Sequence, residues 1–186
     1  MSMRWAKNLP YWPPYKDAES TYDLSHLNPF RYQLELPEKG NHPARQTEIR
    51  VAFSAHTFTV GCVIAEGPHL QYSGGQRDLR RFCPDRYRLS KLLPDVIRNL
   101  NTRRCFFAPR ENFFVVEVPG GLPPESEYWV FFDVRGTEDP GAVIVRVQSA
   151  YVGHTKKLPG GLKAKKVGFA VLVNKALRDE RATPPP

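Results

Sequence analysis

Residues 89–100 read LSKLLPDVIRNL, and their apolar side chains recur at helical spacing. The apolar positions fall at i, i+3, i+4, i+7, i+8 and i+11, so they form one stripe along a helix. Arg88, Lys91 and Arg98 occupy the other side. We therefore predict a central amphipathic helix whose stripe, with Leu93 and Ile97 at its middle, covers one face of a β-sheet.

Pro94 lies inside this helical pattern. Proline removes a backbone hydrogen bond and clashes with the preceding turn, but it fits the first turn of a helix. The sequence therefore leaves two outcomes open. Either the helix kinks at Pro94, or it divides into a short turn and a second helix that begins with Pro94 in its first turn.

Segments with alternating apolar and polar residues lie on both sides of the helix. Residues 30–36 and 49–55 alternate across a turn-rich loop, which predicts an N-terminal β-hairpin. After the helix, Pro-Gly and Gly-Gly turns separate four more such segments, which favours antiparallel pairing of neighbours. These predicted strands are 113–118, 128–134, 142–151 and 167–173. The expected fold is α+β, with an N-terminal β-hairpin, a central amphipathic helix and a four-stranded antiparallel meander sheet.

The length of 186 residues suits one domain with a core. We expect a Pro/aromatic-rich arm over 1–20, a single α+β domain over 21–178 and a flexible tail over 179–186. The arm interleaves prolines with aromatic side chains that either pack on their own domain or dock on a partner. These aromatic residues are Trp5, Tyr11, Trp12 and Tyr15.

The expected location is the cytoplasm. No apolar run approaches the roughly 18 to 20 residues that span a bilayer, and residues 1–15 lack the layout of a signal peptide. Cys62, Cys83 and Cys105 are odd in number and widely spaced, which is typical of reduced thiols. We therefore expect a soluble protein without a membrane partner.

Positive charge is concentrated in two stretches of the chain. Residues 74–104 carry nine Lys or Arg against three Asp, and residues 150–178 carry seven Lys or Arg against no acid. The total is +8, so the remaining residues are acidic on balance. A cation set against a phosphate releases condensed counterions, so this concentration points to nucleic acid as a partner, with RNA favoured.

The predicted nucleic-acid-binding residues come from both basic stretches. Arginine offers a planar fork for phosphate oxygens, and the Gly- and Lys-rich segment after residue 153 brings ammonium groups to a phosphate chain. The alternative for the first stretch is a solvated helix face whose arginines pair with Asp78, Asp85 and Asp95. The predicted residues are Arg77, Arg80, Arg81, Arg86, Arg88, Lys91, Arg98, Arg103, Arg104, Lys156, Lys157, Lys163, Lys165 and Lys166.

Histidines and hydroxyls are the candidate catalytic groups. They are His56 on the predicted hairpin, and Ser149, Tyr151 and His154 where the second basic stretch begins. A histidine can transfer a proton near neutral pH while a cation stabilises a pentavalent phosphate, so this set could cleave RNA without a metal. Ser149 and Tyr151 share the register of Val143, Val145 and Val147, which favours interior positions with satisfied hydroxyls.

We expect no cofactor and no metal. The cysteines lack zinc-site spacing, the carboxylates are scattered, and the Gly-Lys-Ser/Thr ending of a P-loop is absent.

A helix followed by a meander with basic loops, over about residues 85–175, resembles the element order of the RelE and barnase-like ribonucleases. Three functions follow as expectations. The first is a basic protein that binds RNA or single-stranded DNA as a component of a larger assembly. The second, which the resemblance implies, is a metal-independent endoribonuclease of toxin type. The third is a protein-interaction module for an acidic partner.

Overall fold

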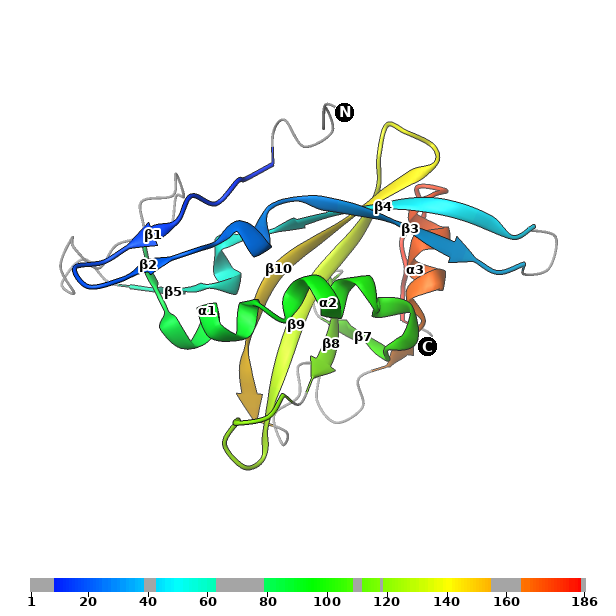
Figure 1. The fold of residues 1–186 in the computed structure, drawn as a ribbon. Coiled ribbons are helices and arrows are strands. Elements are labelled where there is room, and N and C mark those ends of the chain that lie inside the picture. The colour runs from blue at the N-terminus through cyan, green and yellow to red at the C-terminus, as the bar shows by residue number, and fades with distance from the viewer. Residues whose placement is uncertain are drawn as a thin grey trace.

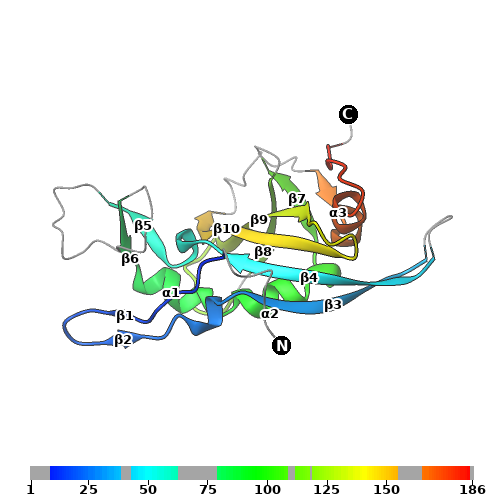
Figure 2. The same cartoon turned by 90° about the horizontal axis from the view of Figure 1, so that it is seen from above.

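A computed structural model describes residues 9–38, 43–62, 79–108, 112–117, 119–154 and 165–184. Its main feature is a mixed sheet of seven strands in the order β11-β7-β8-β9-β10-β4-β3. Two short helices, α1 (Pro84–Ser90) and α2 (Leu93–Arg98), lie against one face of this sheet, and α3 (Phe169–Ala176) lies near one end (Figures 1 and 2). The α+β class is confirmed.

The predicted N-terminal hairpin is confirmed. Strands β3 (Phe30–Leu36) and β4 (Arg45–Phe53) pair antiparallel, with Phe30 opposite Val51. Their inward positions alternate with exposed polar ones, as the period of two requires.

The predicted four-stranded meander is wrong in its extent. Strands β8 (Asn112–Glu117), β9 (Ser126–Gly136) and β10 (Ala142–His154) do pair in sequence order. However, β10 also pairs in parallel with β4, so the hairpin and the meander form one sheet. Strand β7 (Cys105–Ala108), which was not predicted, adds to β8. Local spacing identifies strands, but it does not specify which distant strands share an edge.

The segment predicted as a fourth strand over 167–173 is mostly helix. Only β11 (Lys166–Val167) is extended, and it pairs with β7. In α3, Phe169, Leu172, Val173 and Ala176 are buried at helical spacing. The valines gave this segment the composition of a strand, and packing of the helix against β9 overrides that preference.

The central helix divides at the proline. Helix α1 ends at Ser90, and α2 begins at Leu93 with Pro94 in its first turn. Leu93 and Ile97 are fully buried in the core, as predicted. The divided helix keeps its apolar stripe on the sheet because the break falls between two buried positions.

Smaller elements complete the described fold. Strands β1 (Tyr15–Lys16) and β2 (Thr21–Tyr22) form one short ribbon, and β5 (Thr59–Gly61) and β6 (Arg80–Phe82) form another. Trp12 of the N-terminal segment is buried, and its ring meets Phe58 edge-on at 5.2 Å. Tyr15 stacks on Phe82 at 4.3 Å, so residues of the arm pack on their own domain.

Candidate anion-binding site

Several elements converge beside the last part of β10. The 3-10 helix η3 (Ala55–Thr57) follows β4, and its capping residue Ser54 donates a hydrogen bond to the Gln148 carbonyl at 2.6 Å. The Cys83 amide, just before α1, donates to the Phe58 carbonyl at 3.0 Å. These bonds fix β5, β6 and the start of α1 against the central sheet.

Two arginines meet at one backbone oxygen in this region. The Nη2 of Arg80 donates to the Thr59 carbonyl at 3.1 Å, and Nη1 of Arg86 donates to the same oxygen at 2.8 Å. Arg80 also binds the Thr59 hydroxyl through Nε at 2.6 Å, and it is buried.

Arg86 keeps part of its hydrogen-bonding capacity open. Its Nη1 contacts the carbonyls of Thr59 and His56, at 2.8 and 2.9 Å. Within the described residues, its Nε and Nη2 have no acceptor, and no Asp or Glu is paired with it. The Arg86 side chain is half-buried, and this burial lowers the pKa of its guanidinium. A partly buried cation with open donors is suited to an anionic oxygen.

Two tyrosines adjoin Arg86. Its Cζ lies 5.5 Å from the centre of the Tyr151 ring, whose ring stacks on Phe131 at 5.4 Å. The Tyr128 hydroxyl is buried, and no described residue forms a hydrogen bond with it. Burial raises the pKa of both Tyr128 and Tyr151, so both phenols stay protonated at neutral pH.

The predicted catalytic residues are only partly brought together. His56 and Tyr151 both contact Arg86, His56 through its backbone carbonyl. Ser149 lies at an irregularity of β10, and His154 lies farther along the strand, 3.6 Å from Glu125.

The irregularity overturns the interior placement expected for Ser149 and Tyr151. A β-bulge between Val147 and Ser149 shifts the register by one residue. Ala150 therefore continues the buried row of Val147, while Tyr151 packs with Phe131 on the opposite face. A period-2 pattern read through a bulge assigns every later side chain to the wrong face.

The structure gives the predicted basic residues different surroundings. Arg103 forms an ion pair with Glu117, Arg98 covers the Phe30 ring at 4.1 Å and Lys91 covers the Tyr87 ring at 4.8 Å. The exposed members are Arg81, Arg88, Lys91, Arg98, Arg104, Lys165 and Lys166. The members outside the described residues are Arg77, Lys156, Lys157 and Lys163.

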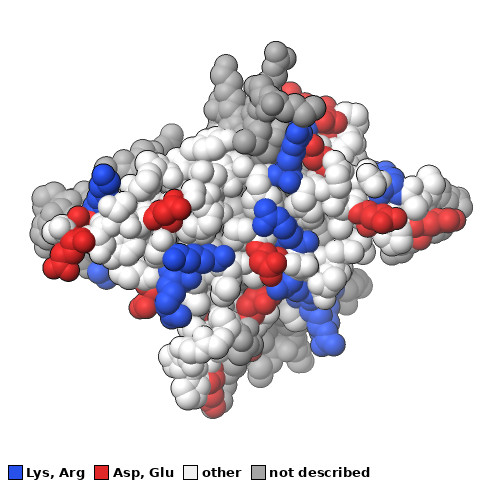
Figure 3. Space-filling model, viewed as in Figure 1, with Lys and Arg blue, Asp and Glu red and all other residues white. Residues whose placement is uncertain are grey.

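Acidic side chains interrupt the basic surface. Over α1 and α2, patches of Lys and Arg alternate with patches of Asp and Glu (Figure 3). The view therefore shows separate cationic patches, not a continuous basic face.

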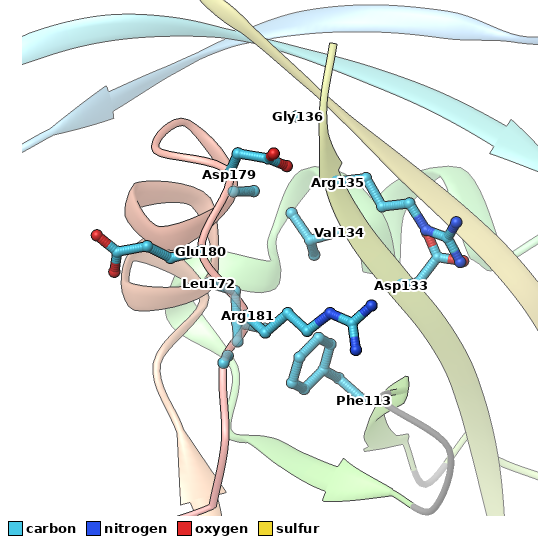
Figure 4. A pocket seen from close by; sticks show the side chains of 11 residues that line it. Phe113, Asp133, Val134, Arg135, Gly136, Leu172, Asp179, Glu180 and Arg181 are labelled. Atoms are coloured by element: carbon cyan, nitrogen blue, oxygen red, sulfur yellow. The ribbon is translucent and has the colours of Figure 1, made fainter.

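A separate pocket of about 470 Å³ lies between β9 and the segment after α3. Arg181 reaches from that segment toward Phe113, while Asp133 and Arg135 extend from β9 (Figure 4). The pocket contains none of the predicted site residues. Its mixed charges come from segments that meet only in the folded chain, so no local sequence pattern predicts this pocket.

Sequence reasoning also missed Thr59 and Tyr128. Thr59 contributes mainly a backbone oxygen, which no side-chain motif reports. Tyr128 begins one of the predicted strands, and its alternating pattern carries no sign of a site.

The thiols and acids give no metal cluster in the described part of the chain. Cys62, Cys83 and Cys105 are free, and burial raises the pKa of Cys105 to about 12. Among the described helices, none has the length and apolar character needed to cross a bilayer.

The YjaZ family model matches residues 14–177. The chain belongs to the YjaZ family. The matched part of the chain includes the residues of the candidate site, which are Arg80, Arg86, Tyr128 and Tyr151. Comparison with curated proteins and with solved structures gave no match.

Proposed function

We propose that this protein binds nucleic acid, with single-stranded RNA as the favoured ligand and single-stranded DNA as the alternative. The observation that carries the proposal is the convergence of Arg80 and Arg86 on the Thr59 carbonyl, where Nε and Nη2 of Arg86 have no acceptor among the described residues. A phosphate oxygen would supply the negative charge and the acceptors that this arrangement favours.

Exposed cations beside this pair support an extended ligand. Arg81 adjoins Arg80 on β6, and Arg88 follows Arg86 on α1. Both are exposed. Separate cationic patches suit a flexible chain that follows them, whereas a rigid duplex needs a matching surface. As in the expectation from sequence, we propose that the protein acts within a larger assembly.

Salt-dependent binding tests the proposal. Fluorescence anisotropy with a labelled single-stranded RNA, at salt concentrations from about 50 to 200 mM, should show affinity falling on the order of a thousandfold if about six phosphates are neutralised. Absence of binding at low salt would remove the proposed function.

A variant that lacks two exposed positive charges tests where the nucleic acid binds. Arg88→Gln with Arg81→Gln should weaken binding to every sequence and flatten the salt dependence, because phosphate contacts carry no sequence information. The matched control is Arg178→Gln, whose exposed guanidinium pairs with Glu180 after α3. Equal affinities for both variants would contradict the assigned surface.

A second candidate is a metal-independent ribonuclease, favoured by the Tyr151 ring beside Arg86 and by His56, whose backbone carbonyl accepts a hydrogen bond from Arg86. Cleavage should then persist in EDTA and leave a 2′,3′-cyclic phosphate. His56→Ala should slow it by about a hundredfold or more while binding survives. RNA that is bound but stays intact, alone and with ribosomes, would eliminate this candidate.

A further inference from the structure

Strand β3 forms one edge of the seven-stranded sheet, and the two edges differ in length. The other edge strand, β11, is two residues long, whereas β3 has seven residues and pairs with β4 without a register shift. In both views the hairpin of β3 and β4 projects beyond the helices (Figures 1 and 2). Among the described residues, no strand pairs with the outer side of β3. A long, regular edge of this kind is a template for pairing with another strand.

Prolines set the ends of this edge. Pro29 precedes β3 and Pro37 follows it. Proline has no N–H group, so it cannot donate a hydrogen bond to a strand that pairs alongside. The seven residues between the two prolines therefore make up the segment that is available for pairing.

The sequence of this segment is complementary to itself in the antiparallel orientation. Arg31 and Glu35 lie two residues on either side of the central Gln33. A second copy of β3 that pairs antiparallel about Gln33 therefore has its Glu35 opposite Arg31 and its Arg31 opposite Glu35. Opposite charges in directly facing positions stabilise an antiparallel pair of strands.

The apolar positions match in the same register. Phe30 faces Leu36 of the second copy, and Tyr32 faces Leu34, so apolar side chains meet on the inward side of the strands. Phe30 and Tyr32 are only partly buried within one chain, and a second copy would cover more of both rings. A shift by two residues in either direction would lose both ion pairs and shorten the overlap.

The charged side chains are accessible for this pairing. Arg31, Gln33 and Glu35 are exposed on the outward face of β3. No described residue forms an ion pair with Glu35. Arg31 pairs with Glu48 of β4 at 2.9 Å. A guanidinium offers five N–H donors, so a second carboxylate that faces Arg31 adds to this ion pair and does not replace it.

We propose that β3 pairs with β3 of a second copy of this chain, about a two-fold axis at Gln33, so that the sheets of the two copies join. The contact is isologous, so the pair of Arg31 with Glu35 occurs twice in it. This self-pairing does not depend on nucleic-acid binding.

Sedimentation equilibrium over a range of protein concentrations measures the association, and we expect a reversible dimer of the unaltered protein. Arg31→Glu and Glu35→Arg each place two pairs of like charges in the interface, so each should weaken self-association by about tenfold or more. Arg45→Glu on β4 is the control. It changes the net charge as Arg31→Glu does, but it lies off the outer edge and should retain the dimer.

A mixture of the two reversed variants is the decisive measurement. The introduced carboxylate of one variant then faces the introduced guanidinium of the other, and the retained Glu35 faces the retained Arg31. The mixture should therefore form a heterodimer with nearly the affinity of the unaltered protein. Mixing would not restore an affinity that was lost through misfolding or through loss of the bond between Arg31 and Glu48. Thermal unfolding of each variant shows whether it is folded.

The outcomes that would overturn the proposal are distinct. An unaltered protein that is monomeric at every concentration would leave the β3 edge to a strand of another protein. A dimer that keeps its affinity in both reversed variants would place the contact elsewhere. If a reversed variant does not fold, amide hydrogen exchange of the unaltered protein decides. Protection of the β3 amides should then increase with protein concentration, and unchanged protection would contradict the self-pairing.

Discussion

At the scale of single residues, the indole of Trp129 occupies the space beside Gly153 on the neighbouring strand. A Cβ atom added to Gly153 would lie 2.3 Å from the Trp129 ring. The indole is rigid and Trp129 is buried, so neither group can move away easily. Glycine is therefore required at this position by packing and not by backbone conformation.

We predict that Gly153→Ala destabilises the protein by about 1 to 3 kcal/mol, because overpacking forces the ring or the strand to shift. Urea unfolding would measure the change. Gly120→Ala is the matched control, since nothing lies within 4 Å of its added Cβ. Similar stabilities for the two variants would contradict the proposed clash.

His26 connects the N-terminal segment to the end of α1. Its Nε2 lies 2.8 Å from the Ser90 hydroxyl, which also donates to the Tyr87 carbonyl at 2.8 Å. Burial lowers the pKa of His26 below its usual 6.5; Lys91 lowers it further, while Asp23 opposes the shift. The folded protein therefore disfavours the protonated imidazole.

The sign of the resulting pH dependence follows from this shift. The unfolded chain binds the proton more readily, so stability is retained above about pH 6.5 and falls as the pH decreases through that value. Urea midpoints at about pH 7.5 and 5.5 should therefore differ more for the unaltered protein than for His26→Gln. Equal losses in the two proteins would show that His26 does not contribute.

At the scale of elements, the divided helix is the main apolar layer on the sheet. Leu93 and Ile97 are fully buried, whereas Leu92 is 38% exposed. Leu92 is therefore a control for Leu93 and Ile97, because it is similar in size but more exposed. This difference makes the contribution of the helix to stability measurable.

Leu93→Ala and Ile97→Ala should each cost about 2 to 5 kcal/mol, through lost burial and the cavity left behind. Denaturant unfolding gives both values. Leu92→Ala should cost clearly less. Losses below about 1 kcal/mol for both buried positions would mean that the helix is peripheral to the core.

At the scale of the whole molecule, parallel pairing of β10 with β4 makes the domain continuous. Val143 lies opposite Ile49 and Val147 opposite Phe53, so residues nearly one hundred positions apart share one buried face. Neither the N-terminal hairpin nor the later strands can bury their apolar faces alone.

We therefore expect one cooperative unfolding transition. Unfolding curves measured by near-UV and by far-UV circular dichroism should coincide. A chain that begins at residue 43 lacks β3 and the buried core residues Trp12, Leu24 and Leu27, so it should lose this transition. Two separate transitions in the full chain would contradict the single sheet.

The sequence by itself determined the features that depend on local periodicity and charge. It predicted the hairpin of β3 and β4 and the apolar stripe through Leu93 and Ile97, and it left a kink or a division open at Pro94, because side-chain spacing and proline geometry act over a few residues. It also identified Arg80 and Arg86 as members of a basic stretch. It did not distinguish them from their neighbours.

Only the tertiary structure decided the features that depend on distant contacts. The pairing of β10 with β4 joins segments whose spacing carries no record of each other, and the bulge before Ser149 reverses the faces of later residues. Burial against β9 makes residues 169–176 helical despite their valines. The meeting of Arg80 and Arg86 at the Thr59 carbonyl likewise exists only after folding, because a backbone oxygen acquires its partners from the path of the whole chain.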